Sequence, residues 1–283
     1  MGRITDALKK VTNDRVQRIQ KKPVFQYVVK KVEGAKIEPH IVSFHDPASP
    51  VGEQYKMIRT NLQTLQATKN FKTFALTSSI NGEGKTVTSV NLAITFAHEL
   101  NNKSILLIDA DMRKGKVARY LGIHSRPGLS EILSGEIEAE AAFVSPGIEN
   151  LTVIPAGKMP KNPAELLGSK KMGRLLEGFK ARFDYVFIDT PPVMPLTDPC
   201  VLGPLTDGVI LVVQAGRTQR SAIKTIEHRL YQAHANVIGY ILTNVEYHVP
   251  HYLYRYVHEY HAYDAYYKGV EKSAEKETIE SEV

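Results

Sequence analysis

Short apolar runs alternate with helical stretches through the middle of the chain. The apolar runs are KTFALTS, SILLIDAD, LTVIPA, DYVFIDTPP, DGVILVVQAG and NVIGYILTNV, and the stretches between them include NLAITFAHEL, AELLGSKKMGRLLEGF and SAIKTIEHRLYQ. Runs that are apolar at nearly every position are typical of strands in a parallel sheet that helices cover on both faces. We therefore predict one α/β domain with a mostly parallel sheet over roughly residues 50–245.

The segments on either side of this domain have other patterns. Residues 1–22 place apolar side chains at helical spacing, with Arg and Lys mostly on the other faces, which predicts a short basic amphipathic helix. That helix would pack on its own domain or a partner, or contact an anionic membrane surface. We divide the chain into a basic arm (1–44), the α/β domain (45–246) and a flexible tyrosine-rich tail with an acidic end (247–283).

Charge and cysteine content narrow the choice of partners and cofactors. The net charge is +6 over 283 residues, but residues 1–40 hold ten basic and four acidic residues, and the remaining 26 and 26 cancel. Basic charge confined to an arm argues against a nucleic-acid partner. A single cysteine, Cys200, excludes an internal disulfide and a thiolate-built zinc or iron–sulfur site. No apolar stretch approaches the roughly 18 residues of a membrane span, so we expect a cytoplasmic protein.

The loop after the first apolar run carries the strongest functional signal. It reads SSINGEGKT (78–86) and lies between a predicted strand and a predicted helix, which is the arrangement of a P-loop. Backbone N–H groups and the positive end of the helix would bind phosphates, Lys85 would reach the β- and γ-phosphates, and Thr86 would hold Mg²⁺. Ser79 replaces the usual first glycine or alanine. The expected nucleotide-binding residues are Asn81, Gly82, Glu83, Gly84, Lys85, Thr86 and Val87.

Two other apolar runs end in carboxylates. The run ILLI is followed by Asp109 and Asp111, and the run VFI is followed by Asp189. A single aspartate at such a place is more often a turn or a helix cap. In an open parallel sheet, however, ligands bind beyond the carboxyl ends of the strands, so these three acids would converge on the P-loop.

Together these motifs resemble the bacterial tyrosine kinases, the BY-kinase family of P-loop autokinases. GEGKT, the run into DADMR and the run into DTPP are similar to Walker A, Walker A′ and Walker B of that family, and SPVGEQYKMIRTNL (49–62) and the tyrosine-rich tail also match it. The resemblance implies a MinD/ParA-like fold and an ATP-dependent tyrosine autokinase for exopolysaccharide or capsule synthesis and export. It also implies a separate transmembrane activator, a cognate tyrosine phosphatase and a place at the inner face of the membrane. The opening MGRITDALKK resembles kinases of exosortase-dependent systems.

The resemblance also implies roles for individual residues. Lys85 would bind the phosphates, and Thr86, Asp111 and, through water, Asp189 would hold Mg²⁺. Asp109 is the candidate that accepts or orients the tyrosine hydroxyl proton, although spacing leaves open which of Asp109 and Asp111 is base and which is metal ligand. Arg113 would stabilise transferred phosphate or form a structural ion pair. Asn244 would bind the adenine edge.

The acceptors are expected in the tail. Residues 247–267 hold eight tyrosines interleaved with four histidines. The alternative is an aromatic packing segment or a sheet edge; metal binding by the histidines is disfavoured, since they form no tight ligand pair on a clear helix. The expected phosphoacceptors are Tyr252, Tyr254, Tyr256, Tyr260, Tyr263, Tyr266 and Tyr267.

Residues 50–65 predict an amphipathic helix that carries a candidate oligomerisation motif. Its polar face places Glu53, Lys56 and Arg59 at steps of three, similar to the E-x-x-R-x-x-R motif of the family. Lys56 stands where that motif has its first arginine, and lysine cannot form a bidentate guanidinium pair. The resemblance implies a homo-oligomer, such as a ring, and the lysine puts the strength of that association in doubt. A solvated charge stripe is the alternative.

Three rival functions follow from the same P-loop. A ParA- or MinD-type positioning ATPase would carry a signature lysine where this chain has Ile80, which disfavours that class. A nitrogenase iron protein needs cluster cysteines and is excluded. A nucleotide-binding scaffold without kinase turnover stays open.

Overall fold

The computed structural model describes residues 29–32, 34–99, 102–124 and 127–245. The chain divides into two compact units, Met1–Thr243 and Asn244–Val283, and the sheet and helices below belong to the first. The predicted basic helix (1–22) and the tyrosine-rich tail (247–283) lie outside the described residues. Within the described part of the chain, no helix combines the length and apolarity needed to cross a membrane.

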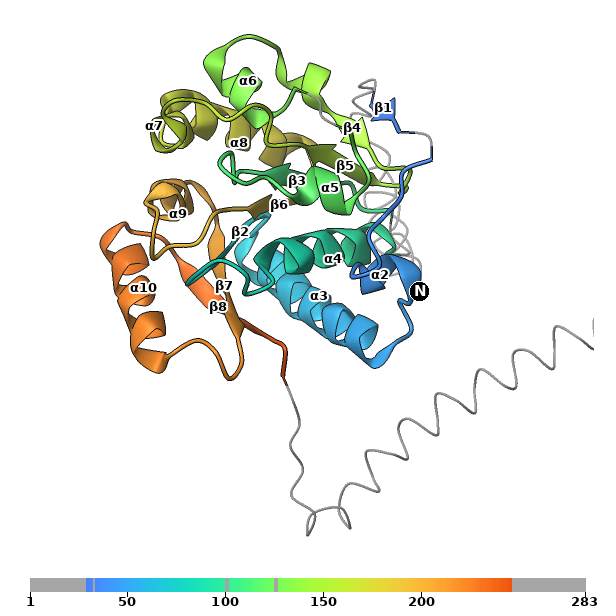
Figure 1. The fold of residues 1–283 in the computed structure, drawn as a ribbon. Helices are drawn as coiled ribbons and strands as arrows, with labels where there is room; N and C mark the ends of the chain where they lie inside the picture. The colour runs from blue at the N-terminus through green and yellow to red at the C-terminus, as the bar shows by residue number, and fades with distance from the viewer. Residues whose placement is uncertain (1–28, 33, 100–101, 125–126, 246–283) are drawn as a thin grey trace, which may run out of the picture. The chain divides into compact units, whose positions relative to one another are not determined.

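An eight-stranded sheet forms the centre of the first unit (Figure 1). Its order is β1-β4-β5-β3-β6-β2-β7-β8, and every neighbouring pair is parallel except β4 with β5. The mostly parallel sheet predicted from the apolar runs is confirmed. The strands are β1 (Lys30–Lys31), β2 (Thr73–Ser78), β3 (Ile105–Asp109), β4 (Val144–Ser145), β5 (Leu151–Ile154), β6 (Tyr185–Asp189), β7 (Gly208–Gln214) and β8 (Val237–Thr243).

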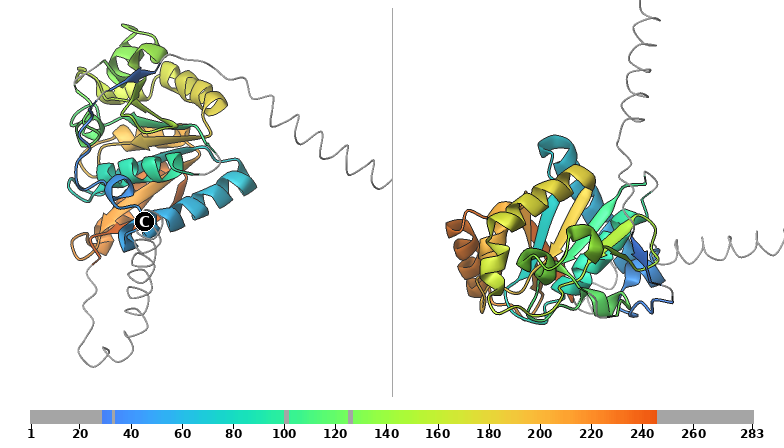
Figure 2. Two further views of the ribbon diagram at one scale, coloured as in Figure 1. Left: turned by 90° about the vertical axis from the view of Figure 1, so that its right-hand side faces the viewer. Right: turned by 90° about the horizontal axis from the view of Figure 1, so that it is seen from above.

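Helices cover both faces of this sheet, and the turned views of Figure 2 show the same layering. On one side lie α2 (Val42–His45), α3 (Pro50–Lys69), α4 (Lys85–Ala97) and α5 (Val117–Tyr120). On the other lie α6 (Leu129–Ser134), α7 (Pro163–Leu167), α8 (Lys170–Arg182), α9 (Asp198–Leu202) and α10 (Arg220–Gln232). Two short 3₁₀ helices, η1 (Ala139–Ala142) and η2 (Gly203–Leu205), join these elements.

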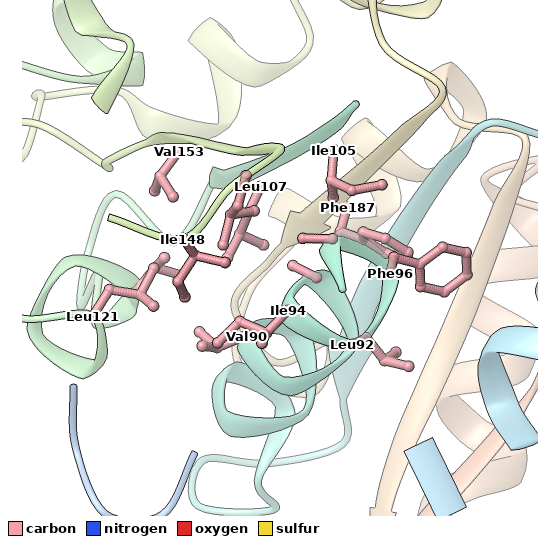
Figure 3. Packing of buried hydrophobic residues seen from close by; sticks show 14 of the residues in the cluster. Val90, Leu92, Ile94, Phe96, Ile105, Leu107, Leu121, Ile148, Val153 and Phe187 are labelled. Carbon is pink, nitrogen blue, oxygen red and sulfur yellow. The ribbon is translucent and has the colours of Figure 1, made fainter. Parts of the chain in front are cut away.

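Strand β3 shows why the apolar runs have no polar face. Ile105 and Leu107 pack in the core beneath α4, whereas Leu106 and Ile108 pack in the core beneath α6 and α8. Since successive side chains of a strand point to opposite faces, both faces of a buried central strand must be apolar. Figure 3 shows the first of these cores, where Phe96 of α4 lies 5.0 Å from Phe187 of β6 between ring centroids.

The predicted helix near residues 50–65 is α3. It begins after Ser49, whose hydroxyl accepts a hydrogen bond from the Gly52 N–H at 3.1 Å, and Pro50 occupies its first turn. It ends at Asn70, which adopts a left-handed conformation with φ of 57°. Its apolar residues pack against the core beneath α4, so the amphipathic interpretation is confirmed; they are Tyr55, Ile58, Leu62 and Leu65.

Part of the predicted basic arm also joins this core. Val32, Ile37 and Ile41 are buried in the same apolar cluster as α4. These residues therefore belong to the α/β domain, and they help to cover the apolar cluster that contains α4.

Candidate active site

The P-loop connects β2 to α4 in the position that the sequence predicts. Gly82 and Gly84 both have φ of 88°, a conformation that residues with a Cβ rarely adopt. Gly84 caps α4, which starts at Lys85. The first-turn N–H groups of α4 therefore stand at the end of the loop, where the helix dipole favours an anion.

The buried side chain of Glu83 stabilises the conformation of this loop. Only 1% of its surface is exposed, and its carboxylate accepts hydrogen bonds from the Ile80 N–H at 2.8 Å and from the Thr218 hydroxyl. The Thr243 hydroxyl donates to the Glu83 carbonyl at 2.8 Å. Sequence reasoning expected Glu83 at the nucleotide and missed Thr218 and Thr243. Thr218 follows β7 and Thr243 is the last residue of β8, so both are far from the loop in sequence.

Four predicted residues converge at the carboxyl ends of the central strands, and we call them the site cluster: Lys85, Thr86, Asp111 and Asp189. Lys85 Nζ lies 3.2 Å from Asp111 Oδ2 and 3.4 Å from Asp189 Oδ2. The Thr86 hydroxyl donates to Asp189 Oδ2 at 2.7 Å. Ser89, one turn further along α4, donates to Asp189 Oδ1 at 3.1 Å and was not foreseen.

Burial sets the electrostatics of this cluster. Burial opposes the charge of Lys85, but the neighbouring carboxylates of Asp189, Asp111 and Asp109 outweigh it and raise the lysine pKa. Asp189 is fully buried, and the loss of hydration raises its pKa although Lys85 and Thr86 favour the ionised form. The carboxylates are thus held close together at an electrostatic cost that an incoming cation would relieve.

Asp109, the last residue of β3, binds the backbone of the segment that follows it. Its two oxygens accept hydrogen bonds from the Asp111 N–H at 3.1 Å and from the Val117 N–H at 3.0 Å. Burial, followed by the charge of Asp189, raises its pKa to about 8. A carboxyl with such a pKa exchanges a proton near neutral pH. In this structure Asp109 also fixes the path of the chain from β3 to α5.

Arg113 forms an ion pair with Asp198 at the start of α9. Its Nε and Nη2 donate to the two carboxylate oxygens at 3.1 and 3.2 Å, and Asp198 is fully buried. The hydrogen bond to Asp198 raises the Arg113 pKa. Of the two roles that the sequence left open for Arg113, the structural pair is therefore present.

A cleft opens between the P-loop and the segment that follows β3. Seven of its lining residues are among those predicted: Asn81, Gly82, Gly84, Lys85, Thr86, Val87 and Asp111. Three more were not foreseen: Lys114, Lys116 and Tyr120. The signal for Lys114 and Lys116 was their position just after DADMR, which places them at the same sheet edge as the P-loop. Tyr120, the last residue of α5, carried no such signal.

Other predicted residues lie elsewhere. Asn244 is exposed, directly follows β8 and has φ of 54°. On α3, Lys56 pairs with Glu53 at 2.6 Å, whereas the Arg59 guanidinium donates to the Thr95 carbonyl of α4 at 2.8 Å. Arg59 therefore already has an intramolecular partner.

The donor set of the site cluster suits a hard divalent cation. Thr86, Asp111 and Asp189 offer only oxygen atoms, and Mg²⁺ is bound through one or two carboxylates together with substrate phosphates and water. Across the described ranges, no group of three or more His, Cys, Asp or Glu side chains forms an all-protein metal site. The residues present thus fit a magnesium ion that arrives with a nucleotide.

The glycine loop, the convergent carboxylates and the parallel sheet define a P-loop nucleotide-binding protein. A family model described as an AAA domain matches residues 71–238. Tyrosine-protein kinase YwqD of Bacillus subtilis (strain 168) is 34% identical over 214 residues, which span 76% of this chain and 90% of that relative.

Solved structures place the chain in the same group. The kinase domain of the Escherichia coli tyrosine kinase ETK superposes with a TM-score of 0.71 at 28% identity, over 82% of this chain and 88% of that chain. MinD of Pyrococcus horikoshii complexed with Mg-ADP has a TM-score of 0.52 at 20% identity, over 64% and 74%, and shares the fold. The chain belongs to the bacterial tyrosine-protein kinases, enzymes that transfer a phosphoryl group to tyrosine.

Proposed function

We propose that this chain is an ATP- and Mg²⁺-dependent tyrosine autokinase that phosphorylates its own C-terminal tyrosines, in trans within a homo-oligomer. The observation that carries the proposal is the convergence of Lys85, Thr86, Asp111 and Asp189 beside the P-loop. Phosphoryl transfer depends mainly on positioning and on neutralising charge, and this cluster supplies both.

Each residue of the site cluster then has a task. Lys85 would contact the β- and γ-phosphates, while Thr86, Asp111 and, through water, Asp189 would hold Mg²⁺. When bound, Mg²⁺ would supply neutralisation of charge on the phosphate oxygens. Glu83 keeps the loop in shape, since its carboxylate fixes the Ile80 N–H. Asn244 is proposed at the adenine edge.

A carboxylate must take the proton of the attacking tyrosine, whose pKa is ordinarily about 10. Asp109 is the proposed acceptor because its raised pKa of about 8 lies near the working pH. Both of its oxygens accept backbone N–H groups, so a role for Asp111 in the same step stays open. The proposed substrates are the tail tyrosines between residues 247 and 267.

We further propose that the kinase acts in exopolysaccharide or capsule synthesis and export, with a separate transmembrane activator and a tyrosine phosphatase, at the inner face of the membrane. This part of the proposal rests on the family resemblance. Oligomer contacts are proposed at Glu53, Lys56 and Arg59 of α3, where Glu53 and Lys56 form a partly exposed ion pair.

One experiment tests both the activity and the transfer between protomers. The full chain is incubated with ATP and Mg²⁺, alone and mixed with a mass-tagged Lys85→Met chain, and residues 247–267 are mapped by mass spectrometry. We expect several phosphotyrosines on the wild type, none on Lys85→Met alone, and phosphate on the inactive chain in the mixture.

Other results would contradict separate parts of the proposal. An unmodified Lys85→Met chain in the mixture would contradict transfer in trans. Release of ADP without any phosphotyrosine would favour a positioning ATPase of the MinD kind, which has the same fold. If Arg59→Glu in both chains leaves transfer in the mixture unchanged, the α3 contact is wrong.

A further inference from the structure

The cleft has a second wall that no role described so far uses. Lys114 and Lys116 line it from the segment between β3 and α5, whereas Lys85 lines it from the P-loop. Both lysines are exposed. The question is what these two cations bind.

The backbone that carries these lysines is fixed at several points. The Lys114 N–H donates to the Asp111 carboxylate at 3.0 Å, and the Val117 N–H donates to Asp109 at 3.0 Å. Between the two lysines, a Cβ on Gly115 would lie 2.6 Å from the Ala156 Cβ and 2.9 Å from an Asp109 oxygen. Only glycine fits at this close approach. The lysines are therefore presented to the cleft by a fixed segment.

The charges across the cleft are unequal. On the inner side Lys85 already faces two carboxylates, those of Asp111 and Asp189. In the part of the chain that the structure describes, neither Lys114 nor Lys116 forms an ion pair with a carboxylate. The outer side thus carries two uncompensated cations, which favour an anion in the cleft.

The position of this segment indicates which part of the anion it meets. Lys85 and Thr86 mark the place of the β- and γ-phosphates and the metal, and the segment continues directly from Asp111, which faces Lys85. If a nucleotide binds with its phosphates at the P-loop, the terminal phosphate would be its group nearest this segment.

We propose that Lys114 and Lys116 bind the terminal phosphate of the nucleotide from the side opposite the P-loop, so that this wall distinguishes ATP from ADP. The inference rests on the proposed function and adds to it two residues that determine nucleotide specificity. ADP lacks the phosphate that the lysines contact, and it keeps the contacts with the P-loop backbone and Lys85.

The test is the ratio of two dissociation constants, measured on the full chain by isothermal titration with ATP and with ADP. In the Lys114→Gln/Lys116→Gln double variant we expect ATP binding to weaken about tenfold and ADP binding to change less than about twofold, as for the loss of hydrogen bonds between charged groups. Lys170→Gln, which removes an exposed lysine at the start of α8, should leave both constants unchanged.

Equal weakening for ATP and ADP, or no change for either, would overturn the proposal. An unchanged unfolding temperature of the double variant shows that a lost preference is not a folding defect. Tyrosine phosphorylation is scored separately. A chain that binds ATP selectively through these lysines but modifies no tyrosine would refute the autokinase and leave this inference standing.

Discussion

Two clusters of lysine and aspartate lie at opposite ends of β2. The site cluster stands at its carboxyl end, where Lys85 Nζ is 3.4 Å from Asp189. At its amino end is the Asp207 cluster, formed by Lys72, Thr73, Lys180 and Asp207, where Lys180 Nζ is 2.7 Å from Asp207. The residue types are the same, but the surroundings of the carboxylates differ.

Asp207 has all the partners that an ionised carboxylate needs. Oδ2 accepts from the backbone N–H groups of Lys72 and Thr73 and from the Thr73 hydroxyl, at 2.8 to 2.9 Å, and Oδ1 accepts from Lys180. Burial alone would raise the Asp207 pKa, but the hydrogen bonds from Lys180, Lys72 and Thr73 outweigh it and lower the pKa. This cluster stabilises the fold by joining β2, α8 and the start of β7.

In the site cluster, burial outweighs the hydrogen bonds and the lysine charge that favour an ionised carboxylate. Asp189 is more deeply buried than Asp207, and its pKa is raised in spite of Lys85 and Thr86. Buried carboxylates held without full compensation are typical of functional sites. The comparison teaches that a lysine beside an aspartate does not by itself define a site: hydrogen bonds lower the pKa of Asp207, whereas deeper burial raises that of Asp189.

Asp189→Asn should give the largest effect. We expect phosphotransfer to fall at least about a hundredfold, because the side chain loses the charge with which Asp189 is proposed to help hold Mg²⁺. Removing a carboxylate that burial already disfavours should leave the nucleotide-free protein as stable as the wild type or more so. A kinase assay measures the loss of phosphotransfer. Thermal unfolding with and without ATP and Mg²⁺ measures the stability, and the ligand should stabilise the wild type far more than the variant.

Asp207→Asn is the matched change at the other end of β2. An amide cannot pair with Lys180, so the free energy of unfolding should fall by about 1 to 2 kcal/mol. The rate of phosphotransfer per folded molecule should stay unchanged, because the cluster lies at the far end of the strand. Urea denaturation and kinase assays measure the two quantities. A variant that keeps its stability and loses its activity would reverse the assignment of the two clusters.

The sequence predicts the site cluster far better than the Asp207 cluster. Lys85 and Thr86 follow a glycine loop, and Asp189 ends an apolar run, so the parallel sheet alone brings them together. Asp207 and Thr73 are separated by 134 positions, and their contact depends on the pairing of β2 with β7. The residues near Thr73 or near Asp207 in the sequence do not indicate that β2 pairs with β7.

Other contacts were missed for the same reason. The pair of Arg113 with Asp198 and the hydrogen bond from Thr218 to Glu83 span 85 and 135 positions. Two-residue strands such as β1 and β4 are too short to show a period. Lys114 and Lys116, in contrast, stand beside a recognised motif. Attention to the cations just after DADMR would have found them.

The last of the expected effects concerns the pH dependence of stability. Asp109 has a pKa of about 8 in the folded chain, against an ordinary value of about 3.9. Between these values the folded state keeps a proton that the unfolded chain has lost. Raising the pH through this window therefore removes stability, by up to about 1.4 kcal/mol per pH unit. Asp207, with a lowered pKa, does the reverse and loses stability only as the pH falls through the acidic range.

Urea denaturation between about pH 5.5 and pH 8 separates the two carboxylates. Asp109→Asn should flatten the fall in unfolding free energy over this range, although it loses one acceptor for the backbone N–H groups of Asp111 and Val117 and is less stable at every pH. Asp207→Asn, the control, should keep the wild-type slope, because its carboxylate is ionised in both states throughout the range. Equal slopes for the wild type and Asp109→Asn would mean that Asp109 is already ionised in the folded protein. The nucleotide-free site would then hold one more negative charge than proposed, and Asp109, the proposed proton acceptor for tyrosine, would need no prior deprotonation.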